Sequence, residues 1–113
     1  MKRHRLPVHR DARGALIAVE NEALAFAPVR TFVVTGSTGA PRGDHLVPCR
    51  QTMLLVNGTV TVTAGRDGER RTEVLTEPGD AVDLEPGEYV LYRLADTAST
   101  VVVFADRPYR PAS

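Results

Sequence analysis

The chain has 113 residues, a length that suits one domain with one hydrophobic core. Its 14 Lys and Arg residues are balanced by 14 Asp and Glu residues, which gives no electrostatic reason to expect a nucleic-acid or anionic-membrane partner. No apolar run approaches the ~20 residues of a membrane-spanning helix, and a single cysteine excludes an internal disulfide and fits a reducing cytoplasm. We therefore expect a cytoplasmic single domain over residues 1–113, with its core at about residues 8–105 and a short loose tail at 106–113.

Taken in chain order, the predicted elements are short strands. The basic residues 2–5 suggest a solvated terminus, and no later segment shows helical periodicity over three turns. Runs rich in β-branched residues follow at 16–19, 29–35, 51–56, 59–63, 81–84, 89–94 and 100–104, with turn residues at 36–39, 57–58, 65–68, 78–80 and 86–87. The Asn57-Gly58 pair is the strongest hairpin signal, because both central residues of a type I′ turn need positive φ. Strands this short and this closely spaced indicate an all-β sandwich or closed barrel.

Residues 39–58 read GAPRGDHLVPCRQTMLLVNG and combine glycine, histidine and polar residues at a defined spacing. The two end glycines, His45 and Gln51 stand at the positions of the glycines, first histidine and acidic residue in the first signature of the cupin superfamily. Val47 occupies the position of that signature's second histidine. This resemblance implies that the whole chain forms a single cupin (jelly-roll) barrel.

A metal centre is not expected in this barrel. A protein metal site needs three or four ligands around one point. The second cupin signature falls on residues 79–90, and Val90 stands where its histidine ligand belongs. Because Val47 and Gln51 occupy two further ligand positions, only His45 remains, and we expect neither a metal nor another cofactor.

The predicted chemistry therefore rests on His45, since histidine titrates near neutral pH and suits proton transfer. Arg42 is a candidate partner for a phosphate or an enolate oxygen, and Gln51 is a candidate for orienting His45 or a substrate hydroxyl. Arg30 opens a strand and is a candidate at the barrel mouth. Each of these residues also has a non-functional interpretation. His45 could be a hydrogen-bonded barrel histidine, Arg42 and Arg30 could be solvated, and Gln51 could be a buried, hydrogen-bonded amide.

Strand alternation predicts which other side chains face the barrel interior. If the strand is regular, one face carries His45, Val47, Cys49, Gln51, Met53 and Leu55. A proline at position 48 makes a kink or bulge possible there. Tyr92 shares parity with Val90 and should face inward, either to donate to a substrate or to pack. Val47, Met53 and Val90 would then form apolar walls of the substrate site.

Several further segments carry a resemblance to one group of cupins: residues 11–16 (DARGAL), 19–21 (VEN), 25–26 (AF), Arg30, 42–45 (RGDH), Gln51 and 85–86 (EP). On these segments the chain resembles the dTDP-4-keto-6-deoxyhexose 3,4-ketoisomerases, metal-free cupins of deoxysugar pathways, over about residues 8–105. The resemblance implies a nucleotide-linked keto sugar as the small-molecule substrate. It also implies a carbonyl shift between C4 and C3 through an enediol, with His45 removing and returning the proton.

The resemblance is incomplete at three places. The family's second histidine falls on or near Val47, its tyrosine falls on Phe32 or Val33, and its acidic C-terminal extension is reduced to residues 107–110 (RPYR). A single histidine can serve both carbons on one face of the sugar ring. The prediction is therefore a metal-independent isomerase whose chemistry depends on His45.

The apolar replacements leave two alternatives open. Apolar walls with a few placed polar groups are typical of sites for hydrophobic molecules, which favours an isomerase or cyclase acting on a polyketide-like intermediate. A non-catalytic ligand-binding barrel is the other alternative. In each case we expect a homodimer, because small cupins commonly pair edge strands or swap an N-terminal strand.

Overall fold

The strands of this protein are short and are separated by tight turns. A computed structural model describes residues 1–36 and 39–110, so the predicted turn at 36–39 and the predicted tail at 106–113 extend outside the described residues. Within the described range the chain forms eleven strands and one 3₁₀ turn, η1 (Asn21–Ala23). The strands are β1 (Lys2–Arg5), β2 (Val8–Asp11), β3 (Gly14–Ile17), β4 (Arg30–Thr35), β5 (Pro41–Leu46), β6 (Gln51–Asn57), β7 (Val60–Gly65), β8 (Arg71–Leu75), β9 (Asp80–Leu84), β10 (Tyr89–Leu94) and β11 (Thr100–Ala105).

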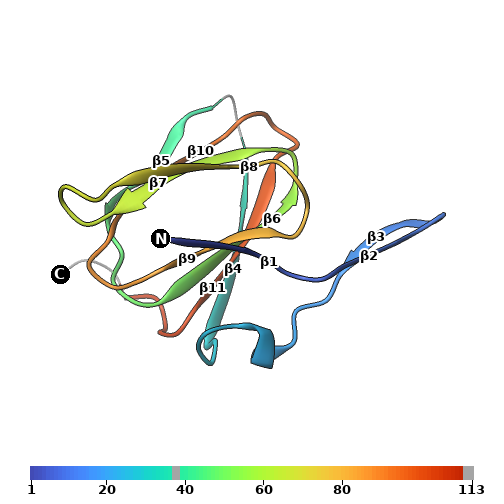
Figure 1. Cartoon of the computed structure of the whole chain (residues 1–113), viewed down its shortest axis with the longest axis horizontal. Helices are drawn as coiled ribbons and strands as arrows, with labels where there is room; N and C mark the ends of the chain where they lie inside the picture. The colour runs from blue at the N-terminus through green and yellow to red at the C-terminus, as the bar shows by residue number, and fades with distance from the viewer. Residues whose placement is uncertain (37–38, 111–113) are drawn as a thin grey trace.

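Two antiparallel sheets face each other and form the body of the molecule (Figure 1). One sheet has the strand order β1-β9-β6-β11-β4, the other has the order β5-β10-β7-β8, and β2 pairs with β3 alone. The all-β cupin fold expected from the sequence is confirmed, with a barrel that consists of two stacked sheets rather than one continuous ladder. No helix in the described part of the chain is both long and apolar enough to span a membrane.

The hydrophobic core lies between the two sheets. Strand register places Phe32, Val103, Met53 and Val82 side by side on the inner face of the five-stranded sheet. From the opposite sheet the core receives Val60, Val62, Ala64, Leu75, Val90, Tyr92 and Leu94. Burying each valine or leucine stabilises the fold by roughly 1.5–3 kcal/mol, so the two facing rows hold the sheets together.

The basic N-terminal run forms an edge strand, which its sequence did not suggest, while three of its four residues are exposed as expected. β1 pairs with β9, which brings Arg3 and Arg5 to the buried Asp80 and His4 to Asp83. Burial alone would raise the pKa of Asp80, but hydrogen bonds from backbone N–H groups of the preceding turn and the two arginine charges outweigh it and lower that pKa. Because the acidic partners of β1 lie far away in the sequence, a local pattern did not predict this strand.

The β2–β3 hairpin projects from the body of the molecule (Figure 1). Where the chain passes beside the outer face of the five-stranded sheet, Leu6, Leu54 and Ala81 form a second buried cluster, with Ile17 and Phe104 packed against it. An apolar hollow of about 400 Å³ lies between the hairpin base and this sheet face. The outer face of one sheet is therefore apolar as well as its inner face.

Candidate active site

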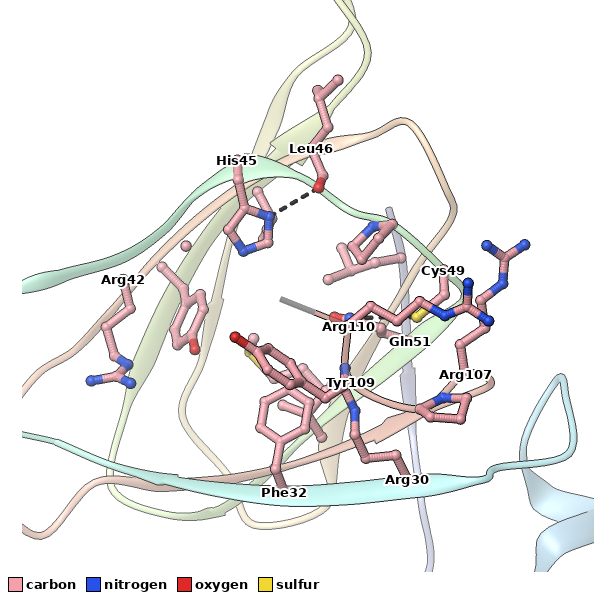
Figure 2. A pocket seen from close by; sticks show the side chains of 18 of the residues that line it. Arg30, Phe32, Arg42, His45, Leu46, Cys49, Gln51, Arg107, Tyr109 and Arg110 are labelled. Carbon is pink, nitrogen blue, oxygen red and sulfur yellow. Dashed lines mark hydrogen bonds between the residues drawn. The ribbon is translucent and has the colours of Figure 1, made fainter. Parts of the chain in front are cut away.

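A cavity of about 1000 Å³ opens between the two sheets (Figure 2). Its floor, called the cavity floor below, consists of strand residues that are almost completely buried: Met53, Leu84, Val90 and Val103. Its more accessible edge, called the cavity rim, carries Arg30, Arg42, His45, Arg107, Tyr109 and Arg110. An apolar floor with a polar rim is typical of a small-molecule site.

A β-bulge in β5 brings two rim side chains onto one face. β5 pairs with β10 so that His45 lies opposite Val90 and Arg42 lies opposite Tyr92, with a register shift at Asp44 between them. Strand residues three apart normally point to opposite faces, and one extra residue restores them to the same face. Asp44 has a φ of 60°, the only positive φ of a non-glycine residue in the described ranges. The bulge therefore turns both Arg42 and His45 toward the cavity.

Two contacts define the shape of this bulge. The Tyr89 hydroxyl donates a hydrogen bond to Asp44 Oδ1 at 2.6 Å, and this bond raises the pKa of Tyr89. Gly43 has a φ of 80°, and a Cβ atom at this position would lie 2.8 Å from the Val90 carbonyl oxygen. A side chain there would clash with the partner strand, so the Gly43-Asp44 pair meets the backbone requirement of the bulge.

The ring of His45 is oriented by its neighbour. Nδ1 lies 2.9 Å from the carbonyl oxygen of Leu46 (Figure 2). A carbonyl oxygen only accepts hydrogen bonds, so this contact assigns the proton of the neutral ring to Nδ1. Nε2 then carries the lone pair and is the ring atom that can take a proton from a substrate.

The cavity lining contains four arginines and, among the described residues, no aspartate or glutamate. Arg30 lies against two aromatic rings, with its Cζ atom 5.1 Å from the Phe32 ring centre and 5.7 Å from that of Tyr109. Its Nε is buried and has no hydrogen-bond partner in the described part of the chain. A buried donor without a partner costs about 1–3 kcal/mol, which an anionic ligand or a water would offset. Although the chain has no net charge, its cavity is cationic.

The C-terminal segment forms part of the rim. Asp106 is tied to Arg50 by two hydrogen bonds at 3.1 Å, one from the Arg50 N–H to Oδ1 and one from its own N–H to the Arg50 carbonyl. From there the chain runs along the cavity and contributes Arg107, Tyr109 and Arg110 (Figure 2). Residues 107–110 have no strand pattern, so only their basic and aromatic composition could have indicated that they line the cavity.

The other predicted site residues are placed as follows. Arg30, Arg42, His45, Gln51, Met53, Val90 and Tyr92 all line the cavity. Val47 does not line the cavity and packs in the core. The regular alternation expected from His45 to Leu55 is interrupted where β5 ends and β6 has yet to begin. The Gln51 amide lies 3.8 Å from Cys49 Sγ and does not contact His45.

The residues at the cupin ligand positions do not fit a metal ion. In residues 1–36 and 39–110, no three side chains of His, Cys, Asp or Glu come together as a possible metal site. Val90 lies directly opposite His45 in the strand pairing and offers no donor atom. His45 alone cannot supply the three or four ligands that a metal needs.

The whole chain matches one protein family. A family model described as "FdtA: WxcM-like, C-terminal" matches residues 1–113. The chain belongs to this family. Among curated proteins, none matches the chain significantly.

Solved structures of sugar-nucleotide isomerases share the fold of this FdtA-family protein. QdtA from Thermoanaerobacterium thermosaccharolyticum, a sugar 3,4-ketoisomerase in complex with TDP, has a TM-score of 0.86 at 19% identity over 96% of this chain and 81% of its own. WlaRB, a TDP-quinovose 3,4-ketoisomerase from Campylobacter jejuni, has a TM-score of 0.87 at 22% identity over 98% of this chain and 88% of its own. ChmJ, a 3'-monoepimerase from Streptomyces bikiniensis in complex with dTDP-quinovose, has a TM-score of 0.80 at 19% identity over 96% of this chain and 65% of its own. The resemblance to 3,4-ketoisomerases predicted from the sequence is confirmed at the level of family and fold.

Proposed function

We propose that this protein is a metal-independent 3,4-ketoisomerase of a thymidine-diphosphate-linked keto sugar. The observation that carries the proposal is that one histidine and four arginines line the same cavity, whose described lining has no carboxylate. A sugar nucleotide brings two negative phosphates, and guanidinium groups bind phosphate oxygens through charge-assisted hydrogen bonds. The solved structures of QdtA with TDP and of ChmJ with dTDP-quinovose support the same substrate class.

The arrangement of rim and floor suggests how such a substrate binds. Arg30, Arg107 and Arg110 are the candidates for the diphosphate, since they are close to one another along one side of the rim (Figure 2). His45 and Arg42 lie on the bulged strand and are assigned to the sugar ring. The cavity floor suits the apolar face and methyl group of a deoxy sugar, while Gln51 and Tyr92 supply polar atoms near it.

In the proposed reaction His45 Nε2 removes the proton from C3 of the 4-keto sugar. The electrons of the C3–H bond form the C3–C4 double bond of an enediolate, and Arg42 stabilises the charge on its oxygen. The proton of the C3 hydroxyl then passes to O4 and the carbonyl forms at C3, while His45 returns its proton to C4. A positioned general base typically contributes about 10²–10⁴-fold to such a step.

The two alternative functions make different predictions. A hydrophobic polyketide-like substrate matches the cavity floor but leaves the charges of four arginines without a partner. A non-catalytic binding barrel would retain the arginines and have no need of a free Nε2 on His45. The combination of cationic rim and oriented histidine therefore favours the ketoisomerase.

The test is incubation with dTDP-4-keto-6-deoxyglucose in D₂O, followed by NMR. We expect deuterium at C3 or C4, formation of the 3-keto isomer, and no loss of either after treatment with EDTA. We also expect dTDP to raise the melting temperature more than thymidine does, because only dTDP has phosphates. Binding of dTDP without exchange or conversion would leave the ligand-binding barrel, and neither binding nor exchange would reject the sugar-nucleotide substrate.

We also propose that two copies of the chain pair through the outer face of the five-stranded sheet. Strand register places Val33 beside Val102 and Leu54 on that face, and Val33 is 60% exposed. Leu16 on the projecting hairpin is also 60% exposed, so both the face and the hairpin present apolar surface to a second copy.

The oligomeric state tests this pairing. Light scattering after size-exclusion chromatography should give a dimer for the wild type and a monomer for Val33→Glu or Leu16→Glu. The matched control is Val74→Glu, which places a charge on the exposed strand β8 of the other sheet and should leave the dimer intact. A wild-type monomer at micromolar concentration would reject the pairing.

A further inference from the structure

Tyr109 reaches the cavity from the C-terminal segment and from no strand of the barrel. Figure 2 shows its ring above Phe32, with the hydroxyl directed into the cavity. Arg30 holds the ring in place, since its Cζ atom lies 5.7 Å from the Tyr109 ring centre and 5.1 Å from that of Phe32. The hydroxyl has no hydrogen-bond partner among the described residues and is free to meet a substrate oxygen.

The proposed isomerisation needs two protons to move. One proton passes between C3 and C4, and the other passes between the two oxygens that those carbons carry. His45 Nε2 is committed to the carbon proton, because one ring nitrogen holds one proton at a time. A second group that can both give and take a proton would complete the reaction.

Besides His45, three described lining side chains can give and take a proton: Cys49, Tyr92 and Tyr109. The Cys49 thiol is 2% exposed and is approached by the Gln51 amide at 3.8 Å. Tyr92 is 9% exposed and packs in the core. Tyr109 is 72% exposed and stands on the rim, where the polar end of a sugar would lie.

We infer that Tyr109 is the second proton-carrying residue of the proposed reaction and moves the proton between the two substrate oxygens. This inference rests on the proposed ketoisomerase function. After His45 has taken the C3 proton and Arg42 has stabilised the charge on O4 of the enediolate, the Tyr109 hydroxyl gives its proton to O4, which produces the neutral enediol. The Tyr109 oxygen then takes the proton of the C3 hydroxyl while the C3 carbonyl forms and His45 protonates C4. Both residues end in their starting protonation states, and no oxidant or reductant is needed.

The experiment compares deuterium exchange at C3 with conversion to the 3-keto isomer in the wild type, Tyr109→Phe and Tyr92→Phe. Exchange needs only the His45 step, whereas conversion also needs the proton transfer between oxygens. In Tyr109→Phe we expect conversion to fall at least about tenfold at nearly unchanged KM, and to fall more than exchange, so that the ratio of exchange to conversion rises. Tyr92→Phe should leave this ratio unchanged.

A rescue variant separates chemistry from packing. Phe32 and Tyr109 both lie against Arg30, and their rings are adjacent (Figure 2). Phe32→Tyr in the Tyr109→Phe background therefore returns a hydroxyl to the same side of the cavity and should restore part of the conversion. Equal losses of exchange and conversion in Tyr109→Phe, or a raised ratio of exchange to conversion in Tyr92→Phe, would overturn the role of Tyr109. Either result would leave the proposed ketoisomerase function standing. A wild-type protein that neither exchanges nor converts would overturn the proposed function and this role with it.

Discussion

The cavity floor and the cavity rim are built in opposite ways. Floor residues such as Met53 and Val103 face each other across paired strands and are 2% and 1% exposed. Rim residues such as His45 and Arg110 are exposed and come from a bulged strand and a C-terminal segment. The floor therefore contributes to the stability and shape of the barrel, whereas the rim can carry chemistry without holding the fold together. Substitutions should separate the two effects.

The largest effect is expected from His45→Gln. Removing the proposed base should lower turnover by about 10²–10⁴-fold while the melting temperature stays within a degree or two, since the side chain is exposed. Steady-state kinetics and thermal melting measure the two quantities. His9→Gln is the matched control, because His9 is exposed on the β2–β3 hairpin. Unchanged turnover in His45→Gln would contradict the assignment of the chemistry to the rim.

Met53→Ala should have the reverse profile. Truncating a buried methionine costs about 2–5 kcal/mol, and the existing cavity beside Met53 places the expected loss near 2 kcal/mol of unfolding free energy. Met53→Leu conserves volume and should cost less than about 1.5 kcal/mol. Urea unfolding measures both variants, and a loss of turnover without a loss of stability would show that the floor has a catalytic role.

Arg30→Met tests whether the rim binds the anionic part of a ligand. Charge-assisted hydrogen bonds contribute about 1.5–3 kcal/mol, so dTDP should bind roughly 10- to 100-fold more weakly, with little change for thymidine. Calorimetric titration at two salt concentrations gives the affinities. Arg93→Met removes an arginine that donates to the Gly39 carbonyl outside the cavity and should leave dTDP affinity unchanged. An equal loss for dTDP and thymidine would argue against a phosphate site.

Asp80 lies outside both regions and should affect stability alone. Its pKa is lowered in the folded protein, so its stabilising contribution is full above the ordinary aspartate pKa and is lost as the pH falls through the folded value. Asp80→Asn should therefore cost about 1–3 kcal/mol near pH 7 and flatten the loss of stability below about pH 4. Unfolding midpoints between pH 2 and 7 measure both. A parallel curve for the variant would mean that Asp80 has no part in acid unfolding.

Local pattern predicted the strands that build the core. The predicted run at 89–94 coincides with β10, and the run at 29–35 differs from β4 by one residue. In contrast, β5 spans Pro41–Leu46 and includes a glycine and an aspartate, so it has no strand pattern and owes its conformation to pairing with β10. Polar edge strands such as β1 escape prediction for the same reason, because their partners come from distant parts of the chain.

The sequence by itself determined the all-β fold, the loss of the metal ligands and the presence of His45, since each follows from residue type and spacing. Only the tertiary structure decided which side chains meet. The bulge at Asp44 turns Arg42 and His45 to one face, and the contact between Arg50 and Asp106 brings Tyr109 to the rim. Both depend on pairing between segments far apart in the chain, and the strength of such pairing is set by three-dimensional packing and not by local sequence.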